Sequence, residues 1–152
     1  MKLLGELQAE GRMTNVELAS KVGITAPPCL RRVRALEKAG YIRGYHADLD
    51  AQMLGFEVAA FAFVGLSSQA EADLKAFEQE VLQWPQVRSC YMLSGEVDFV
   101  LRCVARNLSD FRAFVTDKLT AAKNVASVKT ALAIRQSKDD PGIPFDSGLG
   151  PA

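Results

Sequence analysis

The spacing of apolar residues changes once along this chain, and that change limits what the chain can fold into. Up to about residue 50 the apolar residues recur every three or four positions, as on one face of a helix, whereas from Phe56 strand-like and helical stretches alternate. The 152 residues are enough for two small domains, each with its own core. We therefore expect a helical domain over 1–43, a linker over 44–55, a mixed domain over 56–136 and a flexible tail rich in proline and glycine over 137–152.

End signals predict three short helices in the first domain. The second helix starts after Thr14 and carries Glu17 three positions later, which is the S/T-x-x-E capping box, and it stops at Gly23. The third has Thr25 as its N-cap and two prolines in its first turn, where missing N–H donors are tolerated, and it ends before Gly40. Three short helices in fifty residues predict a small helical bundle.

Positive charge is concentrated in the third predicted helix, although the whole chain has 18 basic and 18 acidic residues. At about 100° per residue its side chains form two neighbouring stripes, one apolar (Leu30, Val33 and Leu36) and one basic (Arg31, Arg34 and Lys38). A capped helix that follows another through a glycine turn and exposes a cationic stripe is typical of a DNA recognition helix. The alternative interpretation is an ordinary helix with a solvated basic face.

The second domain is predicted to have the element order βαββαβ. Its expected elements are a strand over 56–66, a helix over about 70–84, strands over 87–93 and 99–105 joined by a hairpin with Gly95 at its tip, a helix capped by Ser109, and a strand over 125–135. This order is that of the ferredoxin-like fold, an antiparallel sheet with both helices on one face. The predicted fold class is therefore α+β, a three-helix (winged) helix-turn-helix domain followed by a ferredoxin-like domain.

The face of the sheet without helices needs a cover. We expect this face to carry small or apolar residues at alternate positions, namely Ala60, Ala62, Cys90, Met92, Ala131 and Ala133. Such a face is suited to burial against a second copy of the chain, which predicts a symmetric dimer.

Several other classes of protein lack support in the sequence. The longest apolar run, 58–66, falls far short of the ~20 residues that span a bilayer, and Glu6 interrupts the N-terminus before a signal peptide could develop, so we expect a cytoplasmic protein. The three cysteines have no C-x-x-C spacing and His46 is the only histidine, which predicts free thiols and no metal site. Because nucleophile-elbow, P-loop and dinucleotide-binding motifs are also missing, we expect neither an enzyme nor a cofactor.

Two stretches keep fixed residue types at fixed spacing. The first is G-R-M-T-N-V-E-L-A at 11–19 with V-G-I-T at 22–25, P-C-L-R-R-V-R-A-L-E at 28–37 and G-Y-I at 40–42, and the second is S-G-E-V-D-F at 94–99. Both resemble the Lrp/AsnC (leucine-responsive/asparagine regulator, feast/famine) family of transcription factors, and the likeness extends through Gln136. The resemblance implies a homodimer or larger assembly that binds promoter DNA and senses a small effector, usually an amino acid. An effector-sensing module that does not bind DNA is the alternative.

The resemblance also implies which residues act. Those placed at or near DNA are Thr25, Pro27, Pro28, Arg31, Arg32, Arg34 and Lys38. Cys29 matches the family motif, yet it falls on the apolar side of the helix, where we expect it in the core.

The family places its effector around the hairpin and the last strand, between subunits. The matching positions are Met92, Leu93, Ser94, Gly95, Glu96, Asp98, Ala131 and Ala133. Backbone N–H groups around Gly95 would suit a carboxylate, and Asp98 would accept hydrogen bonds from an α-ammonium group. Structural alternatives stay open, since Gly95 would equally serve a turn with positive φ and Asp98 would equally cap the turn or pair with Arg102.

Overall fold

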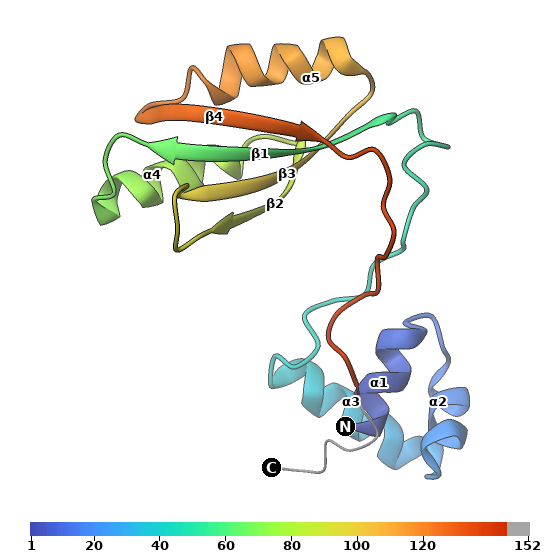
Figure 1. The fold of residues 1–152 in the computed structure, drawn as a ribbon. Helices are drawn as coiled ribbons and strands as arrows, with labels where there is room; N and C mark the ends of the chain where they lie inside the picture. The colour runs from blue at the N-terminus through green and yellow to red at the C-terminus, as the bar shows by residue number, and fades with distance from the viewer. Residues whose placement is uncertain (146–152) are drawn as a thin grey trace. The chain divides into compact units, whose positions relative to one another are not determined.

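The computed structural model describes residues 1–145 and divides the chain into two compact units. Among the described residues, the first unit contains Met1–Asp48 together with residues 137–145, and the second contains Leu49–Gln136 (Figure 1). In the part of the chain that the structure describes, no helix is both long and apolar enough to cross a membrane.

The first unit is built on three helices, α1 (Lys2–Ala9), α2 (Asn15–Val22) and α3 (Ala26–Lys38). Their shared core contains Leu3, Leu18, Ala19 and Cys29, and Cys29 has no exposed surface. The prediction that Cys29 is a core residue is therefore confirmed.

The predicted helix ends of this unit are also confirmed. The backbone N–H of Glu17 donates to Thr14 Oγ1 over 3.3 Å, and the Thr14 N–H donates to Glu17 Oε2 over 2.8 Å, which completes the capping box of α2. Gly23 ends α2 in the left-handed conformation with φ 78°. Because only Ile24 and Thr25 separate Gly23 from the start of α3, the turn between α2 and α3 is as tight as a helix-turn-helix requires. Residues 41–57, all within the described part of the chain, form no strand. The prediction of a winged domain is therefore not matched by a pair of strands after α3.

The second unit is a four-stranded antiparallel sheet with two helical segments. Its elements are β1 (Val58–Leu66), α4 (Glu71–Val81), β2 (Val87–Met92), β3 (Phe99–Ala105), α5 (Leu108–Phe114) continued by the π-helical turn η1 (Val115–Leu119), and β4 (Val125–Leu132). The strand order β2-β3-β1-β4 with antiparallel pairing is the predicted ferredoxin-like arrangement. Several expected boundaries differ: β1 begins at Val58 rather than Phe56, and α4 ends at Val81, β2 at Met92 and β4 at Leu132. Asn107 rather than Ser109 caps α5, accepting a hydrogen bond from the Asp110 N–H over 2.8 Å.

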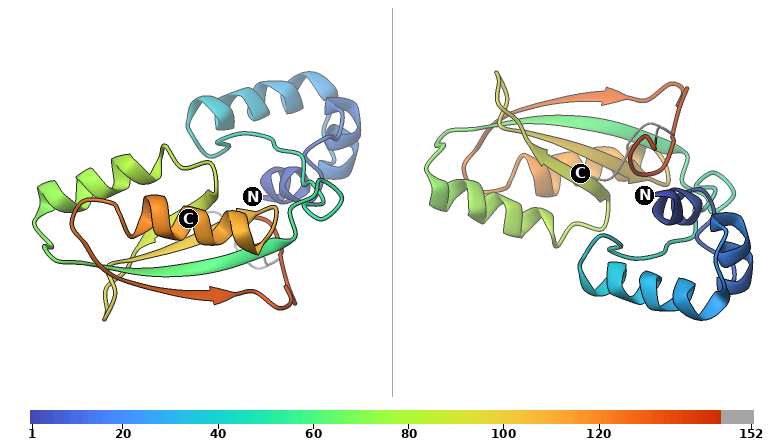
Figure 2. Two further views of the ribbon diagram at one scale, coloured as in Figure 1. Left: turned by 90° about the horizontal axis from the view of Figure 1, so that it is seen from above. Right: turned by 90° about the horizontal axis from the view of Figure 1, so that it is seen from below.

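Both helices of the second unit lie on one face of its sheet, as the two views of Figure 2 show. Ala60 and Ala62 of β1 are fully buried on this covered face, and Cys90 packs against the same core. The prediction that these three residues belong to the helix-free face is therefore wrong, and it is wrong for Met92 too, which lies opposite the buried Phe99. The physical reason is volume: α4 and α5 bring the large rings of Phe77 and Phe114 into this layer, so small side chains fit beneath them.

The helix-free face carries the opposite set of side chains. Phe61 of β1 lies opposite Arg102 of β3 and Ala131 of β4, and Phe63 lies opposite Val100. Phe61 is 39% exposed, which is unusual for a phenylalanine in the middle of a sheet. Ala131 is thus correctly predicted on this face, and aromatic rather than small residues make up its apolar centre.

The three thiols are free, with Cys29 and Cys103 buried and Cys90 half-buried, as expected. Burial raises the pKa of Cys90 and of Cys103 to about 11. Both thiols therefore stay protonated near neutral pH, which suits core residues and not nucleophiles.

Candidate DNA interface and effector site

One face of α3 is exposed and basic. Cys29 is buried, and Val33 and Leu36 pack beside it against the core, so the opposite side of the helix faces outward. The exposed side chains include Arg31, Arg34 and Lys38. Leu30 belongs to the edge of the apolar stripe and not to its centre, because it is 38% exposed.

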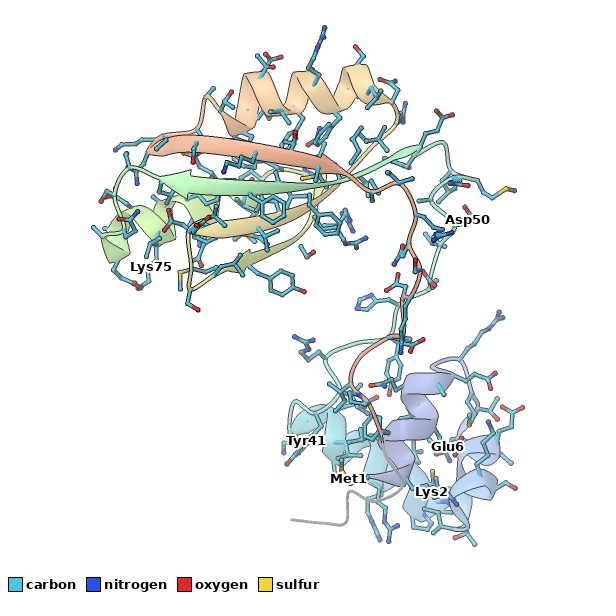
Figure 3. All side chains as sticks on the ribbon, in the orientation of Figure 1. Met1, Lys2, Glu6, Tyr41, Asp50 and Lys75 are labelled. Carbon is cyan, nitrogen blue, oxygen red and sulfur yellow. The ribbon has the colours of Figure 1, made fainter. Side chains whose placement is uncertain are left out.

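The basic side chains of this face have no acidic partner in the part of the chain that the structure describes. The salt bridges of residues 1–145 join Lys21 to Glu6 and Glu10, Lys75 to Glu71, and Lys138 to Asp140, with Glu6 and Lys75 labelled in Figure 3. Glu37, the acid on α3, accepts a hydrogen bond from the Tyr45 hydroxyl over 3.0 Å. The guanidinium groups of α3 are therefore available to an external anion such as phosphate.

The predicted DNA-binding residues divide into two groups in the structure. Thr25, Pro27 and Pro28 lie at the start of α3, next to its exposed basic face. Arg32 points elsewhere, since it is about 160° around the helix from Arg34. It lines a cavity of about 390 Å³ together with Met1, Lys2, Leu3, Val22, Ala35 and Leu36.

The predicted effector residues also divide into two groups. Met92, Leu93, Ser94, Gly95 and Glu96 form the exposed hairpin between β2 and β3. The Asp98 N–H donates to Val64 O over 2.9 Å, which places this hairpin beside the end of β1. Ala131 lies opposite Phe61, and the Ala133 N–H donates to Ala59 O over 2.8 Å, near the start of β1. Within one chain the hairpin therefore lies at one end of the sheet, Ala133 lies near the other end, and Ala131 lies between them.

Asp98 is held by partners that the sequence did not indicate. Its Oδ2 accepts a hydrogen bond from the Leu66 N–H over 2.6 Å and a longer one from Gln69 Nε2 over 3.4 Å. Neither predicted structural partner is correct, because no salt bridge joins Asp98 to Arg102 among the described residues, and the carboxylate accepts from Leu66 and Gln69 rather than from the turn. Gln69 is separated from Asp98 by 29 residues, so no local motif could have linked them.

The backbone conformation at position 95 does not require a glycine. Positive φ angles occur at Gly23, Gly40, Gly55 and Gly142 but not at Gly95, so the alternative that it serves a positive-φ turn is wrong. A methyl group added at Gly95 would meet no atom within 4 Å among the described residues. The glycine leaves the hairpin backbone uncovered, as an anion-binding turn requires.

A helix-turn-helix with a free basic face, joined to a split βαβ unit, defines a class of DNA-binding proteins that carry a sensing domain. The family model for the Lrp/AsnC ligand binding domain matches residues 59–143, and the model for winged helix-turn-helix DNA-binding domains matches residues 1–43. The chain belongs to the Lrp/AsnC family of transcriptional regulators, which is a family of DNA-binding proteins and not of enzymes.

Relatives and solved structures agree with this assignment. The chain is 59% identical over 139 residues to a leucine-responsive regulatory protein of Rhizobium meliloti (strain 1021), covering 91% of this chain and 89% of that protein. It is 40% identical to a Bkd operon transcriptional regulator of Pseudomonas aeruginosa, covering 89% and 88%. A Neisseria meningitidis transcriptional regulator in complex with L-Met superposes with a TM-score of 0.89 at 34% identity, covering 94% and 92%. An AsnC family regulator from Agrobacterium tumefaciens has a TM-score of 0.89 at 32% identity, covering 97% and 96%.

Proposed function

We propose that this protein binds promoter DNA through the exposed face of α3 and that an amino-acid effector changes its DNA binding or its assembly. The observation that carries the proposal is the basic face formed by Arg31, Arg34 and Lys38, which has no acidic partner within residues 1–145, on a helix whose other side is buried. Arginine forks suit guanine edges and phosphates, and Lys38 suits phosphate. We expect the protein to act in the cytoplasm.

The proposed DNA-binding unit is a homodimer. Two α3 helices related by twofold symmetry would enter successive major grooves, about 10 base pairs apart. The helix-free sheet face supports self-association, because it exposes Phe61 and the 63%-exposed Tyr91 in the same layer. We expect sedimentation analysis to show a dimer or a larger assembly such as a tetramer or octamer.

The effector site is proposed to require more than one chain. Its two groups of residues, the hairpin and the Ala131–Ala133 strand end, are separated within one chain. A neighbouring copy would bring the two groups together, so effector binding and assembly would be linked with a coupling of ~1–3 kcal/mol. The L-Met complex of the Neisseria regulator supports an amino acid as the ligand class.

The test is a fluorescence-anisotropy titration against the DNA upstream of the gene, at several salt concentrations and with each of the twenty amino acids. We expect tight binding that weakens steeply with salt and that one or a few amino acids alter. Arg34→Ala should weaken binding by about tenfold or more, and Arg32→Ala, the matched control on the other side of α3, should weaken it less.

A different experimental result would contradict each part of the proposal. Equal losses for Arg34→Ala and Arg32→Ala would contradict the assignment of the exposed face. Amino-acid binding without any affinity for DNA would favour the alternative, a sensing module that does not bind DNA.

A further inference from the structure

A cavity of about 430 Å³ lies on the helical side of the second unit, and no residue of the β2–β3 hairpin lines it. Its walls come from the end of α4, from η1 and from the loop that leads to β4. Two residues of that loop, Ala121 and Ala122, have small side chains that leave the cavity wide. The volume falls within the roughly 300–1,000 Å³ of small-molecule pockets.

Four charged side chains of both signs line this cavity. Glu80 and Asp117 are the acids, and Lys118 and Lys123 are the bases. The salt bridges and side-chain hydrogen bonds of residues 1–145 use none of these four groups. Two carboxylates and two ammonium groups are therefore available to a ligand that carries both charges.

Trp84 adds a polar group of a different kind to the same cavity. Its ring is held by edge-on contacts with Phe77 and Phe114, with ring centroids 6.0 Å and 5.6 Å apart, and the residue is only 8% exposed. A nearly buried indole N–H usually has an acceptor, yet no side-chain hydrogen bond among the described residues uses this one. Because Trp84 lines the cavity, a ligand there can supply a neutral acceptor such as a carbonyl oxygen.

The wide helical turn η1 accounts for the shape of this wall. Phe114 and Leu119 are both buried although they are five positions apart, a spacing that a regular α-helix would place on different sides. The Thr120 hydroxyl closes the turn by donating to the carbonyl oxygens of Val115 and Thr116 over 3.0 Å each. The turn is therefore held by its own backbone and Thr120, and its two charged side chains at the cavity take no part in holding it.

We propose that this cavity binds a short peptide with free ends, of which a dipeptide is the smallest. The N-terminal ammonium group pairs with Glu80 and Asp117, and the C-terminal carboxylate pairs with Lys118 and Lys123. The peptide carbonyl accepts from the indole N–H of Trp84. A single amino acid has both charges on one carbon atom, whereas the charges of the cavity come from three separate segments, so groups separated by a peptide bond match them better.

Trp84 is the only tryptophan of the chain, so its fluorescence reports on this cavity directly. The experiment titrates the full chain with alanyl-alanine and follows Trp84 emission, with calorimetry as a second readout. The comparison probes are N-acetyl-alanyl-alanine, alanyl-alanine amide and alanine. We expect saturable binding of alanyl-alanine and about tenfold weaker binding of the other three, because each lacks one charge or the peptide bond.

Two charge-neutralising variants test the two ends of the ligand separately. Glu80→Gln should lower the affinity for alanyl-alanine several-fold and leave that for the N-acetyl form, which has no ammonium group, unchanged. Lys118→Gln should lower the affinity for alanyl-alanine and leave that for the amide, which has no carboxylate, unchanged. Glu78→Gln, on an exposed residue of α4 that does not line the cavity, is the matched control and should change none of these affinities.

Three results would overturn the inference. If all four probes bind equally well, the cavity does not recognise free peptide ends. If Glu80→Gln and Lys118→Gln bind alanyl-alanine as the wild type does, the peptide binds elsewhere. If neither emission nor calorimetry detects alanyl-alanine, the cavity takes no peptide, and emission that then changes with protein concentration would assign it to a contact between copies of the chain. None of these measurements uses DNA or the effector, so they are decided independently of the proposed function.

Discussion

At the residue scale, Gly95 and Gly23 are glycines for different reasons. Gly23 has φ 78°, a conformation that costs other residues roughly 1–2 kcal/mol, and it ends α2. Gly95 has no such φ and open space around its α-carbon. A methyl group at Gly23 therefore affects folding, whereas one at Gly95 affects only what binds to the hairpin.

Replacing each glycine by alanine separates these two roles. Gly95→Ala should keep the thermal midpoint within about 1 °C and lower effector affinity at least several-fold, because the new methyl group covers the hairpin backbone. Gly23→Ala should lower the midpoint by several degrees and leave effector affinity unchanged. Calorimetry gives both quantities, and a Gly95→Ala protein that binds effector normally would place the ligand away from this hairpin.

At the element scale, the orientation of α3 depends on how α2 begins and ends. The capping box of Thr14 and Glu17 fixes the first turn of α2, and Asn15 Nδ2 donates to Ala26 O over 2.8 Å at the start of α3. Hydrogen bonds from the side chain and backbone of Thr14 lower the pKa of Glu17 below its usual 4.5. The stabilisation by Glu17 is therefore present above the unfolded pKa and is lost as pH falls through the lower folded pKa.

Amide hydrogen exchange on the full chain tests the cap. Thr14→Ala should destabilise α2 by about 1 kcal/mol, seen as faster exchange in its amides, while amides of the sheet are unchanged. Acidification below the usual carboxyl pKa of 4.5 should progressively reduce the difference between wild type and Glu17→Gln, because protonated Glu17 no longer accepts both hydrogen bonds from Thr14. A difference that grows at low pH would show that the folded protein does not lower the pKa of Glu17.

At the scale of the whole molecule, α1 near the N-terminus contacts residues 143–145, which are distant in sequence. Gln8 of α1 pairs with Ile143 through two hydrogen bonds, from Gln8 Nε2 to Ile143 O over 2.6 Å and from the Ile143 N–H to Gln8 Oε1 over 3.1 Å. Phe145 lies against Gly5: a methyl group added to Gly5 would be 3.5 Å from the Phe145 ring. The segment predicted as a flexible tail thus contacts α1 as far as Phe145, and 146–152 lie outside the described residues.

Removing residues 137–152 should therefore loosen α1. We expect faster hydrogen exchange in α1 and a lower midpoint for the helical unit, since two hydrogen bonds and the cover of a helix-interior glycine are lost. Phe145→Ala should have a smaller effect of the same sign, and the amides of β1 and β3 serve as the internal control. Unchanged exchange in α1 would show that this contact adds nothing to stability.

The sequence alone determined the features that depend on local patterns. Caps, glycine turns and apolar periods predicted the three helices, the basic face of α3 and the order βαββαβ, because each of these signals lies within a few residues of its effect. The family motifs at 11–42 and 94–99 predicted the class of protein for the same reason.

Only the tertiary structure decided which face of the sheet is open and what Asp98 contacts. A strand that alternates Phe61 and Phe63 with Ala60 and Ala62 has apolar residues on both sides, and the helices that cover one face come from distant parts of the chain. Asp98 meets Leu66 across 32 residues, and Gln8 meets Ile143 across 135, so both contacts arise only when separate elements pack. Local chemistry therefore predicts the elements and their exposed charges, while packing over long sequence distances sets the geometry around Asp98, in the proposed effector site.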